Sequence, residues 1–306
     1  MRGSLVRIGI GLGLGLGLGS AGCEAALDQR LAIVHDPRVL AIVAEPAEAL
    51  PNTPVTYTAL VASPDGPVAA TPSWAFCIAP KPPTEDDVVV PGCLAGDQIV
   101  SLGTAPTVTG TLPKDGCLLF GPDTPPGGFR PRGADASGGY YQPVRAVVGD
   151  ADAFGLSRIT CKLPNAPADA SRDYQTMYMA NANPTLLPLA LADASGAVVA
   201  ATAVPADADV TLTAAWPAEA AEAYVSYDPG AEKVVPRREA MRVSWFATDG
   251  ALPVDASAVD EPDATSVTRV TTTWHTPAAP GAAWLWLVLR DSRGGIATQE
   301  IAITVR

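Results

Sequence analysis

The amino-acid sequence predicts an all-β protein built from two β-sandwich domains that are joined by a short helical linker. Its 306 residues are too many for one compact domain and suit two. Pro (30) and Gly (28) together approach a fifth of the chain, a proportion typical of short strands separated by many turns. Between these turn residues, short segments of alternating or β-branched apolar residues recur, which is the pattern of strands.

The composition limits both the core and the partners. Hydrophobic residues reach 48% largely through Ala and Val, and aromatic residues only 6%, which is enough for thin β cores. The chain carries 20 Lys and Arg against 32 Asp and Glu, a formal net charge of −12. Because an acidic chain repels polyanions, we expect no nucleic-acid partner.

Residues 1–22 form a predicted signal peptide. Arg2 and Arg7 provide a positively charged start, and residues 8–18 alternate Gly with Ile or Leu before a run of small residues. This apolar stretch is shorter than the ~20 residues that a membrane-spanning helix needs. We therefore expect a leader that is cleaved after export.

The segment Ser-Ala-Gly-Cys at residues 20–23 resembles the lipobox of bacterial lipoproteins. The resemblance implies that Cys23 is the lipid-modified first residue of the mature protein and that residues 23–37 are a tether. Acyl chains at about 0.8 kcal/mol per buried CH₂ would anchor it to a membrane. Ser20 departs from the Leu that the family prefers, so an ordinary secretory leader is the alternative. Glu24, where retained lipoproteins carry Asp, favours the outer membrane, with its periplasmic and cell-surface faces both open.

Four further cysteines predict two disulfides, because an exported chain meets an oxidising environment. Sequential pairing, Cys77 with Cys93 and Cys117 with Cys161, is favoured because it closes local loops. The competing arrangement pairs Cys77 with Cys161 and Cys93 with Cys117. No two cysteines have the spacing of a zinc site, so we expect neither a metal nor a cofactor.

The first domain, residues 38–168, begins with well-marked strands at residues 38–44, 55–62 and 73–77. In the last of these, Trp74 and Phe76 share one face and should fill the core. Weaker strand candidates follow at residues 98–102, 107–112 and 141–148. Residues 154–163 fit either a strand or a short helix.

A Pro- and Gly-rich insertion interrupts this domain between Cys77 and Gly139. Long loops in compact domains are often functional, so residues 122–139 are a candidate partner contact. A merely tolerated insertion is the alternative. The acidic run at residues 85–87 lies in the same region and is read as solvated loop charge.

Residues 169–184 are predicted to be a helical linker that ends the first domain. Ala170, Tyr174, Met177 and Tyr178 recur at helical spacing, and Asp169 is placed to cap the helix. The sequence Asn-Ala-Asn-Pro at residues 181–184 stops the helix. The domain boundary is therefore expected there.

The second domain, residues 185–306, shows the regular strand and turn spacing of a sandwich. A run of β-type sequence begins at Leu186, and further strands are predicted at residues 210–216, 223–227, 242–247, 267–274, 284–290 and 296–306. Trp245 followed by Asp249 and Gly250, together with the closing hairpin, resembles the last strands of PKD-type and bacterial immunoglobulin-like (Ig-like) repeats. The Gly-Asp-Gly segment of PKD domains is missing after the Trp. The first half, around Trp74, resembles a more divergent Ig-like module.

As a whole, the chain resembles exported lipoproteins of high-GC Gram-negative bacteria, a resemblance that implies no activity. The sequence contains no nucleophile elbow, zincin, Ser-x-x-Lys or Walker A motif. His35 and His275 are the only histidines and are expected at the surface, so we predict that the protein is not an enzyme. A carboxylate pair such as Glu219 and Glu222, whose preferred interpretation is solvated loop charge, leaves a hydrolase as the alternative.

Two pairs of Asp residues are weak candidates for calcium, because each places two carboxylates one residue apart. These pairs are Asp150 with Asp152 and Asp207 with Asp209. Neither is followed by the Gly and Glu of an EF-hand loop. Solvated loop charge is therefore the preferred interpretation, and no metal site is predicted.

Trp284 and Trp286 point to one face of their strand, and Leu285 and Leu287 to the other. The Trp face is either buried, in the core or between domains, or exposed as a platform that stacks on sugars. The predicted function is a non-enzymatic, membrane-anchored scaffold or binding module of the envelope or cell surface, with a protein or glycan partner. A carbohydrate-binding envelope protein that uses these Trp residues is the alternative.

Overall fold

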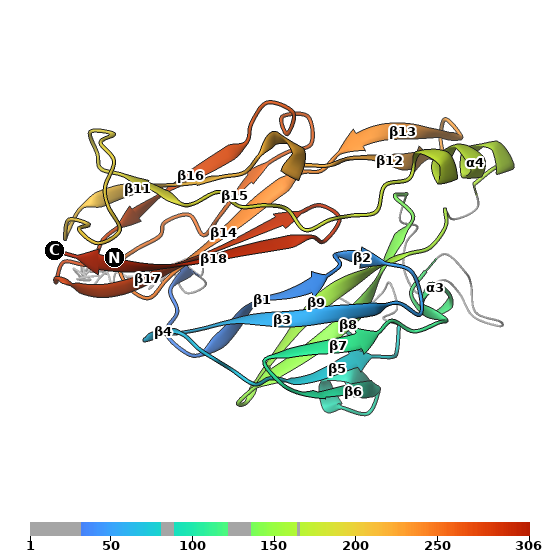
Figure 1. The fold of residues 1–306 in the computed structure, drawn as a ribbon, viewed down its shortest axis with the longest axis horizontal. Helices are drawn as coiled ribbons and strands as arrows, with labels where there is room; N and C mark the ends of the chain where they lie inside the picture. Colours follow the sequence, from blue (N-terminus) through green and yellow to red (C-terminus); the bar gives the residue numbers. More distant parts are fainter. Residues whose placement is uncertain (1–31, 81–88, 122–135, 164–165) are drawn as a thin grey trace, which may run out of the picture.

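The computed structural model describes residues 32–80, 89–121, 136–163 and 166–306 (Figure 1). It confirms the predicted all-β class and shows two sandwiches lying side by side. The signal peptide, Cys23, most of the tether, the acidic run at 85–87 and most of residues 122–139 lie outside the described residues. Predictions about those segments therefore stay predictions.

Two sheets form the first sandwich, with an Ig-like strand order. Strand β3 pairs with β1, β4 and β7 in one sheet, and the other runs in the order β2-β9-β8-β5-β6. Of residues 154–163, which fit either a strand or a short helix by sequence, 154–160 belong to strand β9. The elements are β1 (Arg38–Glu45), β2 (Glu48–Ala49), β3 (Pro54–Ser63), β4 (Gly66–Pro67), β5 (Ser73–Cys77), α2 (Pro91–Ala95), β6 (Ile99–Thr104), β7 (Thr107–Thr111), α3 (Gly116–Leu119), β8 (Gly139–Val148) and β9 (Ala151–Thr160).

Alternating residues of these strands build the core of the first sandwich, as the sequence pattern predicts. Trp74 and Phe76 are buried from β5, and the ring of Tyr57 on β3 meets Phe76 edge-on at a centroid distance of 5.7 Å. The hydroxyl of Tyr57 donates to Ser157 at 3.1 Å, which satisfies its buried oxygen. Burial raises the pKa of Tyr57.

Two disulfides brace the loops of the first sandwich, as the cysteine count predicts. Cys77 at the end of β5 is bonded to Cys93 in α2, and Cys117 in α3 to Cys161 just after β9. These are the sequential pairs. Each ties a short helix of the insertion to the five-stranded sheet.

Two sheets and a projecting hairpin form the second domain. Its sheets run β10-β11-β16 and β15-β14-β17-β18, and the hairpin is β12-β13. β13 and β15 had no counterpart in the sequence prediction. The elements are β10 (Ala190–Ala192), β11 (Asp209–Ala215), η1 (Ala218–Ala220), β12 (Ala223–Asp228), β13 (Lys233–Arg238), β14 (Met241–Ala247), β15 (Ala256–Val259), β16 (Arg269–His275), β17 (Gly281–Asp291) and β18 (Ile296–Val305).

Large side chains fill the core of the second sandwich. Trp216, Trp245 and Trp274 are almost fully buried between its two sheets. The indole of Trp245 donates to Ser257 at 3.1 Å, and that of Trp274 donates to the carbonyl of Asp249 at 3.0 Å. These bonds satisfy the polar ends of Trp245 and Trp274, whereas the buried indole nitrogen of Trp216 has no hydrogen-bond partner among the described residues.

Helix α4 (Ala168–Met177) lies between the sandwiches in sequence and packs on the projecting hairpin. Ala170 and Tyr174, two residues of the helical stripe, are buried there, whereas Met177 of the same stripe is 46% exposed. The predicted cap is wrong: the N-cap residue is Pro167 and makes no side-chain bond. Asp169 lies in the first turn instead and pairs with Arg172 at 3.0 Å.

Candidate functional site

An apolar interface joins the two sandwiches. Trp286 and Val288 of β17 are fully buried against Leu40 and Ala41 of β1, and Trp284 packs on the same cluster. A β-bulge in β1 explains how Leu40 and Ala41, which are consecutive, can both face the second domain. Strand alternation then returns the flanking residues of β1 to the first core.

The interface shows whether Trp284 and Trp286 form the ligand platform considered above. They share a face and stack at a centroid distance of 6.5 Å. Trp286 donates its indole N–H to Glu300 at 3.1 Å, and Trp284 lies so close to Gly66 that an added Cβ would be 2.5 Å from its nitrogen. The exposed platform is therefore wrong: Trp286 is fully buried and Trp284 is half-buried against the interdomain cluster, so the two rings do not form an exposed pair.

The linker after α4 forms a polar strap across both domains. Asn181 is buried and donates its backbone N–H to the carboxylate of Glu48 in the first domain, at 2.8 Å. Its side-chain amide contacts Asp291 of the second domain at 3.3 Å. Asn183 donates to the carbonyl of Ala44 at 2.8 Å and accepts the N–H of Ile296 at 2.8 Å. The linker thus connects the two sandwiches and also holds their relative orientation.

A buried ion pair of the first domain contacts this strap through Glu48. Glu48 and Arg158 meet at 3.1 Å, and both side chains are almost inaccessible to solvent. Arg158 also donates to the hydroxyl of Tyr141 at 3.1 Å, and that hydroxyl donates to the carbonyl of Arg293 at 3.2 Å. The pair is therefore linked to the second domain through Tyr141, and its charges are satisfied by hydrogen bonds.

A second buried cluster surrounds Arg293 in the turn between β17 and β18. Its guanidinium donates to Glu239 at 2.6 Å, to Glu222 at 2.9 Å and to the carbonyl of Met179 at 2.8 Å. Burial, and then the charge of nearby Asp291, raises the pKa of Glu239 to about 7, while Arg293 opposes the shift. Burial also raises the pKa of Asp291. Solvated loop charge is therefore the wrong interpretation for Glu222.

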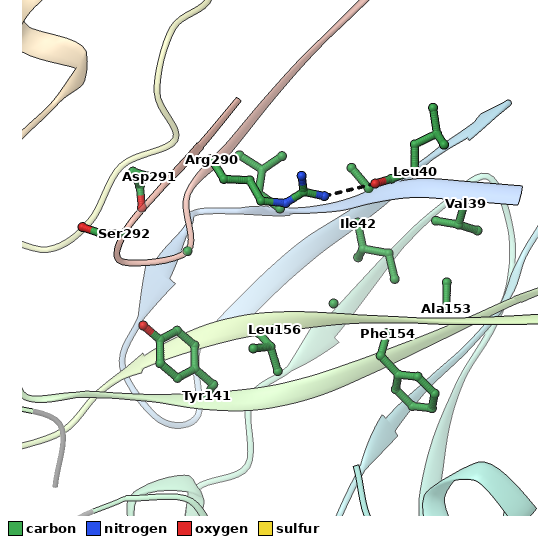
Figure 2. A pocket seen from close by; sticks show the side chains of 14 residues that line it. Val39, Leu40, Ile42, Tyr141, Ala153, Phe154, Leu156, Arg290, Asp291 and Ser292 are labelled. Carbon is green, nitrogen blue, oxygen red and sulfur yellow. Dashed lines mark hydrogen bonds between the residues drawn. The ribbon is translucent and has the colours of Figure 1, made fainter. Parts of the chain in front are cut away.

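A cleft of about 380 Å³ opens where the sandwiches meet (Figure 2). Its walls come from both domains: β1 at Val39–Ile42 and β9 at Ala153–Leu156, faced by the turn around Asp291 and Ser292. Figure 2 shows the guanidinium of Arg290 donating to the carbonyl of Leu40, at 3.1 Å. This bond fixes the spacing between β1 and the β17–β18 turn.

The remaining predicted site residues lie elsewhere. Asp209 and His275 meet at 2.9 Å, with Asp207 at 3.3 Å on the other ring nitrogen. The hydrogen bond to Asp209 raises the pKa of this exposed imidazole. Asp152 pairs with Arg145 at 2.8 Å. Within the described ranges, no group of three or more His, Cys, Asp and Glu side chains is arranged to hold a metal ion.

Sequence reasoning missed the cleft and the strap. Arg290 and Asp291 were assigned only to a strand end and a turn, and Asn181 only to a helix stop. A buried Asn or Arg is recognisable once its partners are known, but those partners lie more than 100 residues away in sequence. The signal available was the polar turn 291–295 between two apolar strands.

Comparisons with known proteins give no family assignment. No family model and no curated protein matches the chain. Among solved structures, it is similar to the adhesin InvE of Yersinia pseudotuberculosis (13% identity, 86% of this chain and 58% of that one, TM-score 0.20). It is also similar to Escherichia coli alpha-2-macroglobulin (12%, 89% and 22%, 0.23) and to the C-terminal domain of the Streptococcus pyogenes antigen I/II-family protein AspA (12%, 89% and 99%, 0.23).

The chain spans little more than half of the InvE chain and less than a quarter of the macroglobulin chain. The Ig-like architecture follows from the strand pairing itself. Across the parts of the chain that are described, no helix has the length and hydropathy to cross a membrane.

Proposed function

We propose that the protein is a non-enzymatic binding module of the bacterial envelope or cell surface, anchored by a lipid on Cys23, that meets its partner in the interdomain cleft. The cleft is the observation that carries the binding role. Two domains contribute its walls, and buried polar and apolar contacts hold those walls in a fixed orientation. A pre-formed concave site is the expected place for recognition.

The lipid anchor is supported by the lipobox resemblance at residues 20–23. Replacement of the lipidated thiol, Cys23→Ser, should move the protein from the membrane pellet to the soluble fraction of the envelope. Ser20→Leu, which restores the preferred lipobox residue, is the matched control and should stay in the pellet. A Cys23→Ser protein that remains in the membrane would overturn the anchor.

The binding role can be tested in intact cells by placing a photo-cross-linking amino acid in the cleft. Leu156 lines the cleft and is 38% exposed, so a probe there should give a discrete adduct in the envelope fraction. Val198 is 89% exposed and lies outside the cleft, which makes it the control position. Equal labelling from both positions would contradict a specific site.

A further inference from the structure

We propose that the cleft accepts an extended polypeptide segment of the partner, which adds a strand to the open edge of β9. This inference rests on the proposed binding function and names the chemistry of the partner. The main chain of the segment would supply hydrogen bonds along residues 151–156, and its side chains would meet the apolar walls of the cleft. Strand addition of this kind needs an unpaired sheet edge beside side-chain pockets.

The edge of β9 is unpaired where it borders the cleft. On one side, β9 pairs with β8 along its whole length. On the other side, β2 pairs only with Arg158 and Ile159. Among the described residues, no strand pairs with residues 151–157 on that side. A row of backbone donors and acceptors without a partner strand is a template for another chain.

The pairing register shows which backbone groups face outward. A two-residue turn joins Val148 to Ala151, so this flanking pair is hydrogen-bonded across the hairpin. The bonded pairs then alternate along an antiparallel ladder. Asp152, Phe154 and Leu156 therefore direct their N–H and C=O groups toward the open edge rather than toward β8.

The path of the chain explains why this edge is open. β1 pairs with β3 in the opposite sheet, and the chain reaches β9 only at β2. β1, the strand that precedes β2, thus belongs to the other sheet and does not cover residues 151–157. It crosses close to Gly155, where an added Cβ would lie 2.8 Å from the Cβ of Ile42.

The chemistry of the cleft favours an apolar strand. Leu156 and Val39 are among its apolar walls, while Arg290 and Ser292 supply polar groups at the far side. The apolar walls are continuous with the buried interface, because Leu40 and Ile296 line the cleft and also belong to or pack on the interdomain cluster. A bound segment would extend a surface that already excludes water.

The direct test uses the peptide acetyl-Lys-Thr-Val-Thr-Val-Thr-Val-Lys-amide, labelled with fluorescein, and the full mature chain. We expect saturable binding by fluorescence anisotropy and slower hydrogen exchange at the amides of Phe154 and Leu156. Two N-methylated peptides, modified at all Thr or at all Val residues, block the two peptide edges in turn. One of them should bind about tenfold more weakly, because it loses pairing hydrogen bonds, and the other should not.

A matched pair of variants tests the same edge on the protein. Leu156→Pro removes the outward N–H without touching the bonded pairs to β8, whereas Leu156→Thr keeps it. We expect the Pro variant to bind the peptide about tenfold more weakly than the Thr variant. If the Pro variant does not fold, as judged by circular dichroism, the N-methylated peptides decide the question.

The outcomes separate this inference from the proposed function. Equal binding of all three peptides would show side-chain recognition alone and overturn strand addition. Absence of peptide binding, with a cross-linked adduct still formed at position 156 in cells, would reject an extended segment and leave the cleft as a site for another occupant. Loss of both signals would overturn both proposals.

Discussion

The two sandwiches reach stability by different means. The first has two disulfides around a core centred on Trp74, Phe76 and Tyr57. The second contains no cysteine and has a larger core with Trp216 and Trp245 among its buried side chains. Covalent links restrict the unfolded chain, whereas large apolar side chains favour the folded one by leaving water. The domain with the long insertion is the one that uses cross-links.

The largest expected effect comes from removing a core ring of the second sandwich. Trp245 is 1% exposed and its N–H is bonded to Ser257, so Trp245→Ala should lower the free energy of unfolding by about 5 kcal/mol. Urea unfolding followed by circular dichroism measures the loss. Trp245→Phe fills more of the space and should cost clearly less. A similar cost for both variants would show that the ring volume is not what stabilises this domain.

Removing the disulfides should weaken the first sandwich, with the larger loss for the disulfide that closes the longer loop. The cysteines are 44 residues apart in one pair and 16 in the other. Loop-closure entropy gives about 4 kcal/mol for Cys117→Ala with Cys161→Ala and about 3 kcal/mol for Cys77→Ala with Cys93→Ala. Urea unfolding of both double variants provides the comparison, and the reverse order would show that native contacts outweigh chain entropy here.

Truncating a side chain in the interface between the sandwiches should cost less stability than truncating a core ring. Trp286 belongs to neither core but is fully buried between the domains, so Trp286→Ala should cost about 3 kcal/mol. We expect the variant to keep both folded domains and lose their fixed orientation, which small-angle X-ray scattering would detect as a larger radius of gyration. An unchanged scattering curve would show that the polar strap alone sets the orientation.

The smallest expected effect is a pH dependence of the free energy of unfolding that arises from the buried cluster around Arg293. The pKa of Glu239 is raised to about 7 by burial, so its contribution to stability is present below the ordinary Glu pKa and is lost as the pH rises through about 7. Glu239→Gln keeps the acceptor for Arg293 without titrating. Its free energy of unfolding should therefore vary less between pH 5 and 8 than that of the wild type. Parallel pH profiles would contradict the assignment to Glu239.

Strand positions were accessible from sequence because they depend on local alternation. The pattern around Trp74 and Phe76, and that of residues 284–290, each present a core face that needs no knowledge of the partner strand. Asp169 was misjudged because capping depends on the backbone angles of the residue before the helix, and the chain starts α4 at Pro167. Met177 was misjudged because a helical stripe does not reveal how wide its partner surface is.

The sequence by itself determined the all-β class, the two-domain organisation expected from it and the cysteines available for cross-linking, because composition, alternation and spacing are local properties. Only the tertiary structure decided that Trp286 faces the other domain, that Asn181 links Glu48 to Asp291, and that one edge of β9 stays open. These features join residues far apart in the chain. They depend on how the surfaces of folded elements fit together, and a local sequence pattern does not encode that fit.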